Sequence, residues 1–458
     1  MTEYKITLTP MTVEEKAADG LIEGLCRAGF TAYRVGGAVR DRLLGYPAHD
    51  VDVATDAPPQ AVRELFPNTY SVGESFGVII VHTPEGVDVE VATFRKDSEY
   101  ADGRHPKEVG FSDSATDARR RDFTINAFFY DPRRVVVLDY TGGMADLRGG
   151  VVRAVGEAEG RFREDHLRML RAVRFAAALG FSLETETEAA LRRQAAAIKR
   201  ISSERVMQEL TRMLTGCRPA YALRMLEEYG LLEAVLPEVA GLRGVEQPPQ
   251  FHPEGDVWKH TLLMLEKMAM PDPVLAWSVL LHDIGKPLTH EYTDGRDRFP
   301  NHAPRGAEAT GEILKRLKAS SRWVEDTMAA VENHMNFMHV TQMRKSTLRR
   351  LLARPTFPLE LELHRLDCAA SHAKLDGYCY LLDKLAELAD QPQLPPPLVN
   401  GHDLLAMGQK PGPKIGELLK WIEDLQLNGE LEDREQALGR LRDFIEEEKA
   451  SSGEGIDD

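Results

Sequence analysis

The chain has 458 residues, of which 43% are hydrophobic, and this is enough to fill several cores in three or four domains. Its formal net charge of −16 at pH 7 argues against a protein that coats nucleic acid indiscriminately, and we expect no DNA partner. No apolar run approaches the length of a membrane span, and the start MTEYKITLTPMTVEEK lacks the basic and apolar regions of a secretory signal. We therefore expect a cytoplasmic protein with no membrane partner.

The order of β-rich and helical patterns predicts an α+β protein. Short β-rich runs separated by glycine and proline turns indicate an α+β head, and the composition from about residue 151 onward is typical of helices. We expect five segments: a leader helix at 1–30, the head at 31–150, a helical neck at 151–245, a domain at 246–390, and a helical tail at 391–458 with a frayed acidic end.

The first candidate site is VGGAVRD, residues 35–41. Gly36 and Gly37 follow a short apolar run, and two glycines at that point let the backbone approach an anion closely and offer it free N–H groups. Arg40 follows within reach of the same anion, and its guanidinium can bind phosphate oxygens bidentately. A glycine pair alone is usually a turn, but this combination predicts a site for a nucleoside triphosphate.

Two aspartates in DVDVAT are candidate metal ligands and catalytic residues. Asp50 and Asp52 are two positions apart in a strand-like run, so their carboxylates should share one face. Carboxylates suit Mg²⁺, and two such ions can activate an attacking hydroxyl and stabilise a leaving pyrophosphate. Glu90, in the run GVDVEVATF, is a candidate third metal carboxylate; the alternative is an outward-facing charge on an edge strand.

The polar segment 95–118, RKDSEYADGRHPKEVGFSDSATDA, is expected to be a mobile loop near the site. The motif after it, RRRDFTINAFF, places Arg121, Asp122 and Asn126 among apolar side chains. An Arg-Asp pair at the start of a helix could orient a ribose or a phosphate, whereas the alternative is a capping pair.

The helical run EDHLRMLRAVRF carries a stripe of polar residues spaced three apart: Asp165, Arg168, Arg171 and Arg174. A carboxylate beside a guanidinium offers an acceptor next to donors, so Asp165 and Arg168 could bind the edge of cytosine or adenine much as a complementary base would. An ordinary intrahelical ion pair is the alternative. Residues 161–218 hold twelve Arg or Lys against seven Asp or Glu, so a confined basic surface could hold one particular RNA; the alternative is a solvated helix face.

A second group of candidate ligands lies downstream, in the runs FHPEGDVWKH, LLHDIGKP, FPNHAP, VENHMNF and HRLDCAASH. Imidazoles together with carboxylates suit Mn²⁺, Ni²⁺, Fe²⁺, Co²⁺ or Zn²⁺ better than Mg²⁺. A lone His on an apolar helix is usually a satisfied core residue, but here six potential ligands follow one another: His260, His282, Asp283, His302, His334 and Asp367.

Five ordered motifs together resemble the class II tRNA nucleotidyltransferase and bacterial poly(A) polymerase family: VGGAVRD…LLG…HDVDVAT, RRDFTINA, DYTGG…D, EDHLRMLRAVRF and SSERVMQELTRML. The resemblance covers about residues 31–215 and implies a head of the DNA polymerase beta-like type. In that family the glycines and Arg40 would hold the NTP triphosphate, Asp50 and Asp52 the metals, and Arg121 the nucleotide. Asp165 and Arg168, helped by Arg171 and Arg174, would be the protein template that selects C or A.

Within that family, YADGRHP resembles the flexible loop of CCA-adding and A-adding enzymes. The resemblance therefore implies addition of CCA to the 3′ end of tRNA, with CTP and ATP as substrates. An A-adding enzyme or a poly(A) polymerase is the alternative.

The downstream group resembles the HD phosphohydrolase superfamily with its ligand series complete. Such a domain could hydrolyse phosphomonoesters or 2′,3′-cyclic phosphates, which would block addition to RNA. The tail resembles the C-terminal part of HD-bearing CCA-adding enzymes and is expected to help hold tRNA. A further alternative is a protein that is mainly an HD phosphohydrolase with an RNA-binding head; the intact Asp50 and Asp52 argue against it.

Overall fold

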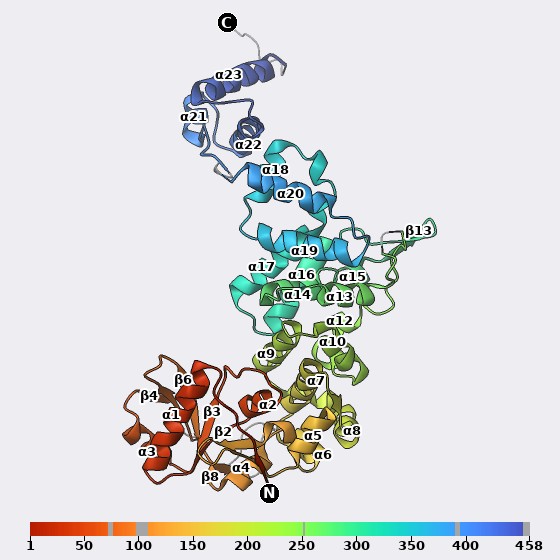
Figure 1. Cartoon of the computed structure of the whole chain (residues 1–458). Helices are drawn as coiled ribbons and strands as arrows, with labels where there is room; N and C mark the ends of the chain where they lie inside the picture. The colour runs from red at the N-terminus through yellow and green to blue at the C-terminus, as the bar shows by residue number, and fades with distance from the viewer. Residues whose placement is uncertain (72–76, 98–108, 251, 390–393, 452–458) are drawn as a thin grey trace. The chain divides into compact units, whose positions relative to one another are not determined.

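The computed structural model describes residues 1–71, 77–97, 109–250, 252–389 and 394–451. The chain divides into two compact units: Met1–Gly241 with Ile313–Ala319, and Leu242–Glu312 with Ser320–Asp458. Figure 1 labels their helices and strands along the chain. Among the described residues, no helix combines the length and the apolar character needed to cross a membrane.

The first unit contains an eight-stranded sheet in its described residues, with the order β1-β10-β9-β2-β3-β6-β5-β4. Only the pair β3–β6 runs parallel in this sheet; the other neighbours are antiparallel. Its strands are β1 (Thr2–Lys5), β2 (Ala32–Val35), β3 (Asp52–Thr55), β4 (Thr69–Ser71), β5 (Val78–His82), β6 (Asp88–Thr93), β9 (Phe128–Asp131) and β10 (Val136–Asp139). Two small pairs are β7 (Arg95–Asp97) with β8 (Val109–Phe111), and β11 (Val151–Val152) with β12 (Ser182–Leu183).

Helices make up most of the rest of the first unit. They are α1 (Val13–Arg27), α2 (Gly37–Leu43), α3 (Pro59–Leu65), α4 (Ser114–Arg120), α5 (Gly143–Gly149), α6 (Ala158–Glu164), α7 (Leu167–Leu179), α8 (Thr185–Gln194), α9 (Ser203–Leu214), α10 (Pro219–Glu228), α11 (Leu232–Val235) and α12 (Pro237–Ala240), with 3₁₀ turns at Thr124–Asn126 and Ala195–Arg200.

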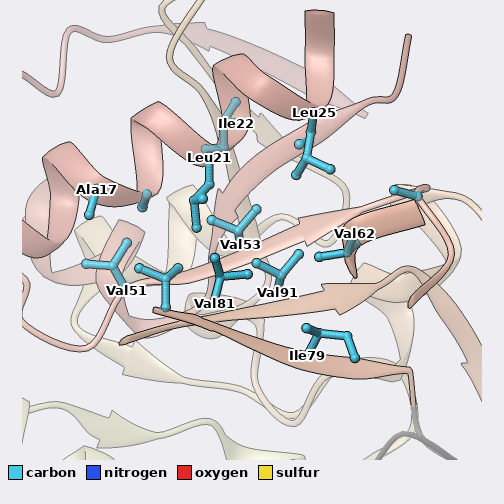
Figure 2. Close-up of a cluster of buried hydrophobic side chains, with 14 of the residues drawn as sticks. Ala17, Leu21, Ile22, Leu25, Val51, Val53, Val62, Ile79, Val81 and Val91 are labelled. Carbon is cyan, nitrogen blue, oxygen red and sulfur yellow. The ribbon is translucent and has the colours of Figure 1, made fainter. Parts of the chain in front are cut away.

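The sheet of the head has a separate apolar cluster for each face. Because side chains alternate along a strand, Val53 of β3 lies in the cluster with α1, whereas its neighbour Ala54 lies in the other cluster with Phe94 and Phe129. Figure 2 shows Leu21 of α1 and the other apolar residues of that helix over β3, β5 and β6. Asp52 and Glu90 alternate with residues of this cluster along β3 and β6, so they belong to the opposite face of the sheet.

Two expectations about the head need revision. Residues 1–30 contribute more than a leader helix, because β1 pairs with β10 and extends the sheet. The segment 95–118, expected to be a loop, contains β7, β8 and α4. Residues 98–108, including the whole YADGRHP motif, lie outside the described residues.

The second unit is almost entirely helical. Its elements are α13 (Val257–Glu266), α14 (Pro273–Leu281), α15 (Lys286–Thr289), α16 (His302–Arg316), α17 (Ser321–Asn333), α18 (Lys345–Leu352), α19 (Phe357–Ala370), α20 (Asp376–Glu387), α21 (Gly401–Ala406), α22 (Pro413–Asn428) and α23 (Arg434–Ser451), 3₁₀ turns at His334–Phe337 and Val340–Gln342, and the hairpin β13 (Glu291–Thr293) with β14 (Arg296–Arg298). Helix α14, apolar all round, is buried against α13, α17 and α19. Helices α21, α22 and α23 share a separate apolar cluster in the tail. The predicted α+β class, with a mainly helical remainder, is confirmed.

Candidate active site and candidate metal centre

One cavity of about 780 Å³ in the first unit brings together every residue of the head and neck that the sequence singled out. Its walls come from the β2–α2 turn, β3, β6, the end of α4, α7 and α9. The predicted residues that line it are Gly36, Gly37, Arg40, Asp50, Asp52, Glu90, Arg121, Asp122, Asn126, Asp165, Arg168, Arg171 and Arg174.

Three carboxylates crowd the sheet side of this cavity. Strand β3 begins at Asp52, so Asp50 precedes the strand instead of sharing its regular face. The parallel register Val53↔Val91 sets Asp52 beside Glu90. Burial, together with the negative charges of Glu90 and Asp50, raises the pKa of Asp52 to about 7. Burial and the charge of Asp50 also raise the pKa of Glu90.

This crowding is the structural observation that fits a bound cation. Carboxylates that raise one another's pKa are relieved by a divalent ion, and oxygen ligands of this kind match Mg²⁺. Asp50, Asp52 and Glu90 are therefore candidate ligands for such an ion. Asp88, on the same face of β6, instead contacts Tyr70 and lies 2.8 Å from the Nδ1 atom of His82.

The glycine pair lies at the β2–α2 turn beside two arginines. Gly36 has φ +76°, a conformation that favours glycine, and a Cβ atom there would lie 3.1 Å from Nη1 of Arg121. Arg40 is buried and donates to Oδ1 of Asn126 at 2.5 Å and to Oδ1 of Asp41 at 2.9 Å. The turn therefore combines a close backbone approach with cationic groups, as phosphate binding requires.

Asp122 and Asn126 connect the glycine turn to helix α7. The Asn126 amide donates to Oδ1 of Asp122 at 3.1 Å, and Oδ2 of Asp122 accepts from Nε of Arg171 at 2.8 Å. Burial alone would raise the pKa of Asp122, but the charge and hydrogen bond of Arg171 lower it to about 2. A continuous hydrogen-bonded chain thus runs from Arg40 to Arg171 through two buried side chains.

The predicted Asp165–Arg168 stripe is arranged differently from the expectation. Helix α7 begins at Leu167, so Asp165 lies just before the helix, where its Oδ1 atom accepts the Leu167 N–H. Its ion-pair partner is Arg205, which donates to both carboxylate oxygens at 3.1 and 2.7 Å. Arg168 donates instead to Glu164 at 2.5 Å. The intrahelical ion pair between Asp165 and Arg168 is therefore not formed, although both residues line the cavity.

Two residues that line the cavity, Arg205 and Phe175, and one that contacts a lining residue, Glu209, were missed by the sequence reasoning or left without a role. Arg205 and Glu209 lie one turn apart in SSERVMQELTRML, a spacing that places them on one helical face. Buried Glu209 accepts from Nε of Arg174 at 2.7 Å. The ring of Phe175 lies under the guanidinium groups of Arg40, Arg171 and Arg174 at 5.0, 5.2 and 4.2 Å.

The second unit brings together all six residues predicted as ligands. Two groups have donor atoms within 4.8 Å of one another: His260 with His282 and Asp367, and Asp283 with His302 and His334. The adjacent residues His282 and Asp283 link the groups, because Nε2 of His282 lies 3.0 Å from Oδ2 of Asp283.

The imidazoles of this cluster are oriented for metal binding. The Nδ1 atoms of His282, His302 and His334 lie 2.9, 2.9 and 2.6 Å from backbone carbonyl oxygens, so each ring carries its proton on Nδ1 and leaves Nε2 free as a ligand. The Nε2 atoms of His260 and His282 are buried without forming a hydrogen bond. Buried donor atoms left open toward a common centre fit a cation.

The electrostatics of the cluster differ between His334 and His260. Burial and the neighbouring histidines lower the pKa of His334 to about 4, so it is neutral at physiological pH, as a ligand must be. Burial alone would lower the pKa of His260, but the carboxylates of Asp367 and Glu254 raise it to about 9. Glu254 and His252 form a third group with His260 and were not singled out from FHPEGDVWKH, because a Glu and a His in a loop carry no spacing signal.

Comparisons with known proteins find matches for the segments that contain these two sites. Family models match the "Poly A polymerase head domain" at residues 32–153, the "Probable RNA and SrmB- binding site of polymerase A" at 180–242, the HD domain at 256–370 and tRNA nucleotidyltransferase domain 2 at 393–441.

Curated relatives cover nearly the whole chain. The CCA-adding enzyme of Lactiplantibacillus plantarum is 35% identical over 90% of this chain and 92% of that protein. The CCA-adding enzyme of Geobacillus stearothermophilus is 35% identical over 92% of this chain and 94% of that protein.

Solved structures of CCA-adding enzymes also resemble this chain. The Bacillus stearothermophilus CCA-adding enzyme in complex with CTP has a TM-score of 0.75, is 28% identical, and covers 96% of this chain and 100% of that one. The Thermotoga maritima CCA-adding enzyme complexed with tRNA_CCA shares the fold, with a TM-score of 0.60 at 18% identity, over 97% of this chain and 100% of that one. The chain therefore belongs to the family of CCA-adding enzymes.

Proposed function

We propose that this protein adds C, C and A to the 3′ end of tRNA, with CTP and ATP as substrates, in the cytoplasm. The observation that carries this proposal is the single cavity in which a carboxylate cluster, a glycine turn with arginines, and the Asp165 carboxylate face one another. The relatives named above are CCA-adding enzymes, which favours CCA addition over the alternatives of A addition, poly(A) synthesis and an HD phosphohydrolase with a merely RNA-binding head.

The residues on the sheet side of the cavity and at the glycine turn have the chemistry to bind metal and triphosphate. Asp50 and Asp52, with Glu90, would hold Mg²⁺, which supplies positive charge for activating the attacking hydroxyl and stabilising the pyrophosphate. Gly36 and Gly37 offer backbone N–H groups, and Arg40 a guanidinium, to the triphosphate. The bond from the tRNA 3′ oxygen to the α-phosphorus forms as the bond to pyrophosphate breaks.

The helical side of the cavity would read the base and hold the sugar. Asp165 can accept the exocyclic amino group of C or A, while Arg168 donates to the adjacent ring nitrogen. Arg121 and the network of Asp122 and Asn126 would orient the ribose and phosphates, and Arg171 with Arg174 would keep that network in place.

For the second unit we propose a metal-dependent phosphohydrolase that acts on phosphomonoesters or 2′,3′-cyclic phosphates at RNA ends. His260, His282, Asp283, His302, His334 and Asp367 would hold the metal, and their imidazole content favours Mn, Ni, Fe, Co or Zn. The metal would supply the Lewis acidity for attack of water on phosphorus. Removing a terminal or cyclic phosphate leaves the free hydroxyl that nucleotide addition needs.

The two activities should be separable. Asp52→Ala should abolish nucleotide addition to a trimmed tRNA and leave phosphatase activity intact, because the two ligand sets belong to different units. The double variant His282→Ala, Asp283→Ala should do the reverse. Asp88→Ala is the matched control, since this carboxylate shares the face of β6 but does not line the cavity. Loss of both activities in one folded variant would contradict two independent centres.

A further inference from the structure

The four histidines of the metal-binding cluster are oriented in two different ways. Three of them, His282, His302 and His334, direct Nδ1 to backbone carbonyls. His260 instead directs Nδ1 to the side chain of Glu254, whose Oε1 atom lies 2.6 Å away. The orientation of His260 therefore depends on a side chain that a substitution can remove.

Glu254 is itself held in place inside the protein. Its side chain is only 6% exposed, and Oε1 also lies 2.9 Å from Nδ1 of His252. The other oxygen, Oε2, is buried and has no hydrogen-bond partner among the described residues. A buried carboxylate that contacts two imidazoles and leaves one oxygen unpaired is costly, which indicates a role beyond packing.

A separate cation between His252, Glu254 and His260 is disfavoured by the chemistry of the shared imidazole. Nε2 of His260 faces Oδ1 of Asp367 at 3.1 Å, within the group that also contains His282. A neutral imidazole has one lone pair for a metal, because its other nitrogen carries a proton. If Nε2 is the ligand, Nδ1–H must donate, and Glu254 is the acceptor in place.

We infer that Glu254 is a positioning residue of the metal centre: it accepts the Nδ1–H of His260, fixes the tautomer that exposes Nε2, and is held by His252. This inference rests on the proposed metal site of the second unit and extends it by a residue that does not itself bind the metal. Removing such an outer carboxylate typically weakens metal binding by about 10- to 100-fold.

The test is direct metal binding by the full chain, measured calorimetrically with Ni²⁺ after chelator treatment. Glu254→Ala should raise the Kd for Ni²⁺ by about 10- to 100-fold, and Glu254→Gln, which keeps one oxygen acceptor, should raise it less. The visible absorption of bound Co²⁺, which reports on the ligand geometry, should change in Glu254→Ala. Asp297→Ala is the matched control, because it removes a carboxylate that contacts His290, an imidazole outside the ligand groups.

The outcomes separate this inference from the proposed function. If His282→Ala, Asp283→Ala abolishes Ni²⁺ binding while Glu254→Ala or Glu254→Gln, folded by thermal melting, retains the wild-type Kd, Glu254 is merely structural and the inference is overturned. If Glu254→Ala does not fold, the Gln variant decides the matter by the same criterion. If the wild-type protein binds no Ni²⁺ or Co²⁺ at the cluster, the proposed metal site fails and the inference fails with it.

Discussion

At the scale of single residues, the base selection that we propose would depend on how the Asp165 carboxylate is held. Arg205 donates to both of its oxygens, yet each carboxylate oxygen has a further lone pair that can accept a base amino group. Arg205 therefore fixes the direction of the acceptor, whereas Asp165 supplies it.

This arrangement predicts that Asp165→Ala lowers discrimination against UTP and GTP more than it lowers overall turnover. Leaving a polar partner unpaired costs about 1–3 kcal/mol, or roughly ten- to a hundredfold in selectivity. Arg205→Ala should cause a smaller loss of selectivity, because the carboxylate remains but is no longer oriented, and Arg205→Lys should restore part of it. The measurement is kcat/KM for the four NTPs on a trimmed tRNA.

Glu159→Ala serves as the control in that series, because this carboxylate pairs with arginines outside the cavity. If all four rates fall together in Asp165→Ala while the ratio of CTP to UTP stays unchanged, the carboxylate has only a structural role. If Asp165→Ala loses base selectivity but Arg205→Ala keeps the selectivity of the wild type, Asp165 selects the base and Arg205 does not orient it.

The raised pKa of Asp52 predicts that ionisation of this carboxyl lowers the free energy of unfolding of the metal-free protein at high pH. The pKa of Asp52 is about 7 in the folded protein, above its ordinary value of 3.8, so the folded state favours the protonated carboxyl. This contribution to the free energy of unfolding is fully present below pH 3.8 and is lost as the pH rises through 7. Asp52→Asn should therefore raise the free energy of unfolding at pH 8 in chelator by on the order of 1–4 kcal/mol. The melting temperature should rise accordingly, and the gain should shrink toward pH 4.

Asp88→Asn provides the opposite control for this experiment. Hydrogen bonds from Tyr70 and His82 lower the pKa of Asp88, so its substitution should give no gain at pH 8. A melting temperature of Asp52→Asn that equals or falls below the wild-type value at every pH would show that the carboxylates of this cavity do not repel one another.

At the scale of elements, the sequence motifs located the walls of the cavity but not the contacts between them. Periodicity placed Asp165 on a helix with Arg168, yet an Asp side chain readily accepts a backbone N–H at a helix start, and the helix begins two residues later. The pairs Arg205–Asp165 and Arg171–Asp122 join residues 40 and 49 positions apart, and no local spacing encodes such pairs. That the six candidate ligands of the second unit lie together was predicted from a His-Asp pair at the end of an apolar run with further His and Asp residues along the chain. That they bind a metal stays a prediction.

One close contact between elements should decide whether the second centre forms. A Cβ atom on Gly285, which precedes α15, would lie 2.0 Å from the carbonyl oxygen of His302 at the start of α16. Gly285→Ala should therefore displace His302. Ni²⁺ binding should weaken by at least tenfold, which is about the effect of losing the orientation of one ligand. Nucleotide addition should be unchanged.

Gly416→Ala is the control for that substitution, since a Cβ atom in this α22 position has nothing within 4 Å. It should leave both activities unchanged and stabilise the helix slightly. Wild-type Ni²⁺ affinity in Gly285→Ala would mean that α15 and α16 can separate without moving the ligands.

At the scale of the whole molecule, the two units each carry one centre, and the chain's acidic charge is unevenly distributed. The net charge of −16 coexists with twelve basic and seven acidic residues at 161–218, so we expect RNA binding to be confined to a part of the surface. The fold class and the family could be predicted because five motifs occur in this sequence in a specific order. The β1 strand at the edge of the sheet was not predicted, because TEYK is too short and polar to register as a strand.

The central claim is that this cavity builds CCA in order. It is tested most directly by the products formed from a tRNA transcript that ends at its discriminator base, with CTP, ATP or both. We predict addition of two C residues with CTP alone, no extension with ATP alone, and CCA with both. Extension by ATP alone, or a run of A residues when both nucleotides are present, would contradict the account and identify an A-adding enzyme or a poly(A) polymerase.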